Sequence, residues 1–282
     1  MMPNLLTKTA RSVIEIIPDQ QLQDALTQAF EESSKSVRKC ENFFEQLPSQ
    51  RWSDKFLATF FGTWKATHLK MLAIYGLSCR LQRLALAADV PAREELLLSS
   101  AYNAETSHED LGLDYEGVTH TQLYEDLASS FLGNYPWQLE EYCLPQAREF
   151  KNWIYRNMVV GDITTGLLTN MFSEIYNHAE YTTALASFSQ YVDAHCNFSV
   201  EKKEKALIYI NAHVADETEV NHFLVVVKAL DAYNKATNSQ LDYQQAKALF
   251  KSYLSRLGLV MEELTLAMQQ EINESKNLLC VS

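Results

Sequence analysis

The sequence predicts an all-α fold, formed by a single bundle of seven helices. Apolar residues recur every three to four positions over long segments, and no alternating strand pattern of useful length occurs. The 8 glycines and 6 prolines of the 282-residue chain cluster between these segments, and the links are short. We therefore expect one helical domain at residues 20–275, preceded by an N-terminal extension at residues 1–19. The predicted helices are residues 20–46, 53–88, 91–112, 119–131, 152–193, 199–233 and 242–273.

Local signals define the ends of the first four helices. The first ends at Leu47-Pro48, because proline cannot continue a helix. Ser53 is the expected N-cap of the second helix, which ends before Val90. Pro91 suits the first turn of the third helix, and Thr119 caps the fourth.

The remaining three helices include the longest apolar stripe. In the fifth helix, Gly161 and Gly166 are expected to cause a bend, and Pro145 lies in an interruption before it. Ser199 begins the sixth helix and Asp242 caps the seventh. The stripe of the fifth helix comprises Val160, Ile163, Leu167, Asn170 or Met171, Glu174, His178, Tyr181, Leu185, Phe188 and Val192.

Composition and charge argue against several classes of partner. The net charge is -12 and no block of Lys or Arg forms a stripe, so we expect neither nucleic acid nor an anionic membrane as a partner. No apolar run approaches the length of a membrane span, and no secretory signal is recognisable. The 5 cysteines form no CxxC pair, which argues against disulfides or structural zinc and favours a cytoplasmic protein.

Three pairs of carboxylate and imidazole groups share helix faces. Glu174 and His178 interrupt the apolar stripe, where a carboxylate is costly unless it is paired or bound to a metal. A spacing of three or four also joins Glu105 to His108 and Glu219 to His222. Such groups can hold a metal inside a bundle, and mixed carboxylate and imidazole ligands favour iron or manganese. Alternatively, each pair is a buried histidine hydrogen-bonded to its glutamate.

Two segments carry a resemblance to a known superfamily. Residues 155–166, YRNMVVGDITTG, resemble the glycine-rich distal-helix motif of heme oxygenases. Residues 103–124, NAETSHEDLGLDYEGVTHTQLY, resemble the N…EExGxG…H..L[FY] segment of heme-oxygenase-like diiron oxidases. That group includes CADD-like proteins, and its members share a seven-helix fold related to TenA proteins. The resemblance covers about residues 91–233 and implies a heme-oxygenase-like bundle.

The last motif of that family, H-x3-D-x2-H, is present in two halves that are out of register. His213-x3-Glu217 matches its first half, and Glu219-x2-His222 matches its second half. On a regular helix the two histidines would lie about 180° apart, too far to share a site. Either a π-bulge changes the angle between the two histidines around the helix axis, or only one half of the motif binds metal.

The resemblance also implies a set of ligands and an activity. The implied metal ligands are Glu109 (or Asp110), His120, Glu174, His213, Glu217 and His222, with Glu105, His108, His178 and Glu219 as substitutes. They would hold two non-heme irons per chain in an O2-dependent oxidase or oxygenase, and we assign no catalytic residue apart from them. The expected substrate is a small organic molecule, an amino acid or fatty acid, that undergoes C–C or C–N cleavage, desaturation or oxygen insertion. A homodimer is left open.

Other classes of function fit the same helices. One is a metal-free, TenA-like hydrolase that uses a buried glutamate and a nucleophilic cysteine, for which Cys143 and Cys196 are the candidates. Another is a non-catalytic helical binding protein whose buried polar residues determine helix register. Heme binding through His68 is a weaker option.

Overall fold

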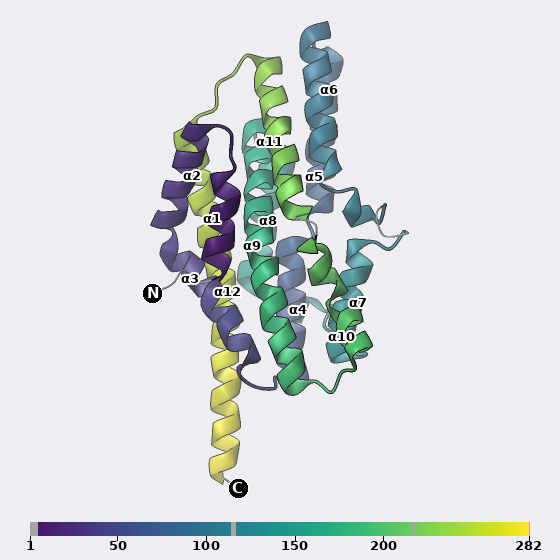
Figure 1. Cartoon of the computed structure of the whole chain (residues 1–282), viewed down its shortest axis with the longest axis vertical. Coiled ribbons are helices and arrows are strands. Elements are labelled where there is room, and N and C mark those ends of the chain that lie inside the picture. Colours follow the sequence, from purple (N-terminus) through teal and green to yellow (C-terminus); the bar gives the residue numbers. More distant parts are fainter. Residues whose placement is uncertain (1–4, 114–116, 216–217, 282) are drawn as a thin grey trace.

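The computed structural model describes residues 5–113, 117–215 and 218–281, without the side chains of residue 109 and residues 275–281. These residues form twelve α-helices and no strand, which confirms the all-α prediction (Figure 1). The helices are α1 (Leu5–Glu15), α2 (Gln20–Glu32), α3 (Ser34–Gln46), α4 (Asp54–His68), α5 (Met71–Ala87), α6 (Val90–Glu105), α7 (His120–Leu132), α8 (Pro145–Tyr155), α9 (Ile163–His195), α10 (Val200–Ala212), α11 (Thr218–Thr237) and α12 (Tyr243–Val281). The short segments η1 (Leu47–Ser49), η2 (Glu109–Leu111) and η3 (Glu140–Tyr142) are 3-10 turns, and η4 (Arg156–Val160) is π-helical.

The predicted count of seven helices was wrong, because several periodic segments are broken within the described chain. Ser33 separates α2 from α3, and Leu69 and Lys70 separate α4 from α5. The sixth predicted helix is likewise two helices, since α10 ends at Ala212 and α11 begins at Thr218. Each break redirects the chain while the apolar periodicity continues on both sides.

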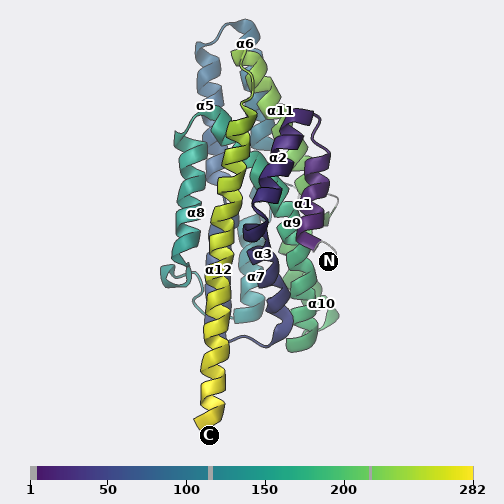
Figure 2. The same ribbon diagram turned by 90° about the vertical axis from the view of Figure 1, so that its left-hand side faces the viewer.

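The long helix α9 forms the centre of the bundle. It packs against α1, α5, α10, α11 and α12, and most of its residues are buried (Figures 1 and 2). Asp162 caps it by accepting a hydrogen bond from the Thr165 amide at 2.8 Å. Val160, expected on the buried stripe, is instead 76% exposed because it lies in η4, before the α9 helix starts. The predicted bend is therefore a break at Gly161–Asp162.

Gly166 provides a close approach, although to another helix. A Cβ at this position would lie 2.9 Å from a methyl carbon of Leu77 in α5. The absence of a side chain thus lets α9 and α5 pack tightly. The approach brings the beginning of α9 against α5, and the polar residues of α9 lie one to four turns further along.

The helix α1 lies within the segment predicted as an N-terminal extension. It buries Leu6, Ala10, Val13 and Ile14, and it packs on α9. The domain limits themselves stay a prediction. In the ranges that the structure describes, no helix combines the length and the apolar character needed to cross a membrane.

Candidate metal centre

A small cavity of about 20 Å³ lies between the middle of α9 and five neighbouring segments. Its volume is enough for one water-sized occupant. The segments are the α4–α5 junction, the end of α6 with η2, the start of α7, the end of α10 and the start of α11. The lining residues are His68, Leu69, Lys70, Thr106, Asp110, His120, Glu174, Asn177, Tyr181, Tyr209, His213, Glu219 and His222.

Glu174, Glu219 and His222 form a carboxylate–histidine triad at this cavity. One ligand atom from each lies within 4.8 Å of the others. His222 Nδ1 is 3.8 Å from Glu174 Oε2 and 3.8 Å from Glu219 Oε2. The two carboxylates are 2% and 1% exposed. Such a buried pair is costly unless a proton or a cation lies between its oxygens.

The break between α10 and α11 removes the register conflict in the last motif. His213 follows α10 as its C-cap residue, and its Nδ1 lies 2.6 Å from Glu219 Oε1. The prediction of one continuous helix at residues 199–233 was therefore wrong, and the separation of about 180° that such a helix would give His213 and His222 does not apply. Both histidines instead lie beside Glu219, which had been named only as a substitute. Glu217 lies outside the described residues.

A second group adjoins the triad through His213. His120 is the first residue of α7, and its Nδ1 lies 2.9 Å from Asp110 Oδ1. The rings of His120 and His213 have centroids 4.7 Å apart. The structure therefore brings together Asp110, His120 and His213 from η2, α7 and the end of α10. The side chain of Glu109, the other candidate from η2, lies outside the description.

The remaining substitutes lie away from the cavity. Glu105 and His108 are exposed, and neither lines it. His178 is half-buried on α9 and is also absent from the lining. His178 shares a face of α9 with Glu174 but lies about 6 Å further along the helix axis, beyond the cavity lining.

The buried environment changes the pKa values of the cluster. Burial raises the pKa of Glu174 to about 8, with the neighbouring Glu219 adding to the effect and Lys70 opposing it. Burial alone would raise the pKa of Glu219, but its contacts with His213 and His222 hold that pKa well below the ordinary value. Burial lowers the pKa of His213, which favours a neutral imidazole. A neutral imidazole beside a carboxylate is the form that binds a metal.

Lys70 was missed by the sequence reasoning. Its Nζ lies 2.8 Å from Glu174 Oε1, it also contacts the Ser173 hydroxyl, and its side chain is only 11% exposed. It reaches the cluster because α4 ends at His68 and the chain turns before α5. The only signal was a lysine inside an apolar segment, Leu69-Lys70-Met71-Leu72.

Aromatic rings and a third buried carboxylate, Glu180, adjoin the residues of the cavity. Tyr181 stacks on the His213 ring, with centroids 4.0 Å apart and planes 4° apart. The Trp64 Nε1 donates to Glu180 Oε1 at 2.8 Å, and His68 Nε2 lies 3.5 Å from Glu180 Oε2. His68, the residue considered for heme binding, is thus buried beside the cavity, where its ring lies 4.9 Å from that of Tyr181.

Comparisons with known proteins identify the fold. No protein-family model matches the chain, and no curated protein matches it. Among solved structures, a TenA homolog from Pseudomonas syringae pv. tomato strain DC3000 superposes with a TM-score of 0.63. The match covers 88% of this chain and 92% of that chain at 11% sequence identity, so it concerns the fold alone. The chain adopts the TenA/heme-oxygenase-like fold.

Proposed function

We propose that the protein is a non-heme diiron oxidoreductase that uses O2 to oxidise a small organic substrate. The observation that carries this proposal is the convergence of Glu174, Glu219 and His222, with His213 on the other oxygen of Glu219. Glu174, Glu219 and His222 would hold one ion. Asp110, His120 and His213 would hold the second.

The donor atoms of the cluster suit a metal ion. Within the described chain, His213 Nε2 and Glu219 Oε2 are buried and have no hydrogen-bond partner, which leaves a lone pair on each for a cation. The donor set contains carboxylates and imidazoles without a thiolate, which favours iron or manganese over structural zinc. The raised pKa of Glu174 means that a cation would replace a proton there.

The chain's own groups would prepare this chemistry. When bound, the irons would supply the activation of O2. The Glu219 carboxylate accepts a hydrogen bond from His213 Nδ1 in the tautomer that leaves Nε2 as a ligand atom. The Tyr181 ring holds the plane of the His213 imidazole. The small buried cavity excludes bulk water from the reacting atoms.

Metal counting with a matched variant tests the proposal. The protein is loaded with Fe(II) without oxygen, passed through a desalting column and analysed for iron per chain. We expect about two irons in the wild type and a loss of most of this iron in Glu219→Gln, which keeps the size but removes the charge. Glu41→Gln is the control, because Glu41 is also a buried carboxylate (5% exposed) but lies on α3 beside Arg38. Equal iron in wild type and Glu219→Gln would contradict the proposal.

The metal-free hydrolase alternative requires a cysteine beside a buried glutamate. Cys40, Cys79, Cys143 and Cys196 are free, and none of them lines the cavity at Glu174. Burial also raises the pKa of both candidates, Cys143 and Cys196, which makes the nucleophilic thiolate scarcer. The carboxylate–histidine cluster is therefore the better basis for a function.

A further inference from the structure

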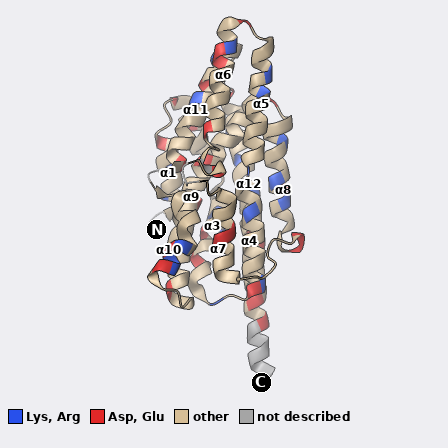
Figure 3. Ribbon diagram, turned by 90° about the vertical axis from the view of Figure 1, so that its right-hand side faces the viewer, with Lys and Arg blue, Asp and Glu red and all other residues tan. Residues whose placement is uncertain are grey.

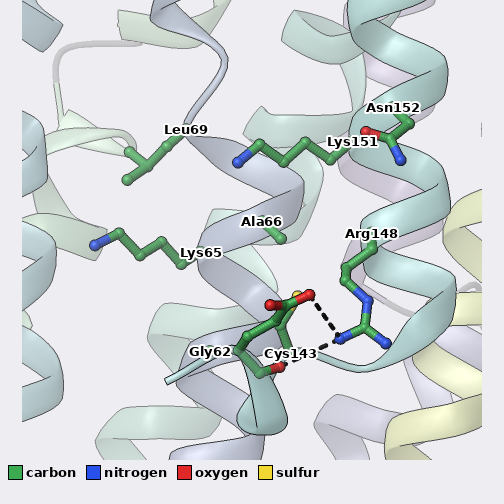
Figure 4. Close-up of a pocket in the computed structure, with 9 residues that line it drawn as sticks. Gly62, Lys65, Ala66, Leu69, Cys143, Arg148, Lys151 and Asn152 are labelled. Carbon is green, nitrogen blue, oxygen red and sulfur yellow. Dashed lines mark hydrogen bonds and ion pairs between the residues drawn. The ribbon is translucent and has the colours of Figure 1, made fainter. Parts of the chain in front are cut away.

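A surface pocket of about 490 Å³ lies between α4 and α8 (Figure 4). The α4 helix contributes Gly62, Lys65 and Ala66 to its wall, and α8 contributes Arg148 and Lys151. The volume lies in the range that accommodates small-molecule ligands. None of the proposed metal ligands lines this pocket.

The pocket concentrates positive charge on a chain whose net charge is -12. Lys65, Arg148 and Lys151 line it together with a single carboxylate, Glu140, and Figure 3 shows the basic residues along α8. Glu140 is a weak partner, since its side chain is 87% exposed and its Oε1 lies 3.9 Å from Arg148. A positive concavity on an acidic protein attracts an anionic ligand.

Lys151 is the cation best placed to bind that ligand. Within the described residues it makes no hydrogen bond or ion pair, and Figure 4 shows its side chain extended across the pocket towards α4. Lys65, by contrast, already pairs with Glu125 at 3.2 Å and faces the Trp137 ring. Arg148 Nη1 donates to the Glu140 carbonyl oxygen at 3.3 Å, and its other N–H groups remain for an anion together with Lys151.

Leu69 connects this pocket to the candidate metal centre. It lines both the surface pocket and the small cavity of the cluster. It follows directly after α4, and the next residue, Lys70, contacts Glu174. A molecule whose charged end lies at Lys151 and whose carbon body covers Ala66 would reach Leu69 with its other end.

We propose that the α4–α8 pocket binds the carboxylate of the substrate. Lys151 and Arg148 contact the charged group. Leu69 lies between the carbon chain of the substrate and the carboxylate–histidine cluster. The ligand class is a small aliphatic carboxylic acid. The role of the bound acid as substrate rests on the proposed function, whereas its binding does not. The two proposals therefore fail separately: the binding test uses metal-free protein, and the iron count needs no acid.

Calorimetry on metal-free protein tests the binding, with octanoate as the probe and octanol as its uncharged counterpart. We expect octanoate to bind at least about tenfold more tightly than octanol, because the anion makes charge-assisted hydrogen bonds. Lys151→Gln should weaken octanoate binding by about fivefold or more. Lys205→Gln is the matched control, because Lys205 is an exposed lysine on α10, outside the pocket. Equal binding of octanol, or an unaffected Lys151→Gln, would overturn the proposal.

The half-buried Cys143 provides an independent location of the ligand, because it lines the same pocket. The wild-type protein is treated with iodoacetamide at alkaline pH, with and without octanoate, and the alkylation of each cysteine is followed by mass spectrometry. Octanoate should slow the alkylation of Cys143 and leave the exposed Cys79 unchanged. Equal rates at Cys143 with and without octanoate would place the acid elsewhere and refute the assignment.

Discussion

Replacing Lys70 with methionine is expected to tighten metal binding at the triad. The Lys70 ammonium lies 2.8 Å from Glu174 Oε1 with only 11% of its side chain exposed. Hydrogen bonds to charged groups contribute about 1.5–3 kcal/mol. A metal ion that takes Glu174 as a ligand must displace this contact or share the carboxylate with it. Lys70→Met removes the competitor, so the affinity should rise roughly tenfold to hundredfold.

Anaerobic calorimetric titration with Fe(II), or with Mn(II) as a stable substitute, measures this effect. Lys65→Met is the matched control, since Lys65 lies on α4, shortly before Lys70 in the chain, and pairs at 3.2 Å with Glu125, outside the cluster. Its affinity should stay within a factor of about two of the wild type. An unchanged or weakened affinity in Lys70→Met would refute the view that Lys70 and the metal compete for Glu174.

Two further predictions concern pH and packing. Glu174 has a pKa raised to about 8 from an ordinary 4.5, so the metal-free native state holds a proton that the unfolded chain has lost. The stability that this proton contributes is lost as pH rises through about 8, and above about 6.5 the lowered pKa of His213 no longer opposes the trend. The melting temperature of chelator-treated protein should therefore fall as the pH rises from about 6.5 to 8. Over the same range the metal affinity should rise by up to tenfold per pH unit, because the metal displaces the proton of Glu174. A metal affinity that does not change with pH would contradict the assignment of Glu174 as a ligand. Separately, Gly62→Ala should lower the free energy of unfolding by about 1–3 kcal/mol in a urea titration, because a Cβ there would lie 2.8 Å from the Tyr142 carbonyl oxygen. An unchanged urea midpoint would show that the segment around η3 can move away.

The sequence allowed the helical class and many helix ends to be predicted. Ser53, Thr119 and Ser199 cap α4, α7 and α10 as expected, because an N-cap is a local interaction of one side chain with nearby amides. The breaks at Ser33 and Leu69 were not predicted. Residues on both sides of each break keep the helical periodicity, so the redirection depends on packing with distant helices.

The types of residue in the candidate site could be predicted better than the contacts between them. Glu174 was identified because a carboxylate interrupts an apolar stripe. The partnership of His213 with Glu219 could not be derived, because it depends on where α10 ends rather than on spacing along one helix. Lys70 was missed for a related reason: a lysine in a linker is ordinarily solvated, and only the turn between α4 and α5 buries it.

Anomalous scattering at the iron edge, from crystals loaded with Fe(II) without oxygen, tests the central claim most directly. We expect one peak between Glu174, Glu219 and His222, and a second beside Asp110, His120 and His213. The same crystals should show whether the Lys70 ammonium has left Glu174 Oε1. An absence of anomalous density at the cluster, with Lys70 still on Glu174, would contradict the assignment of a metal centre.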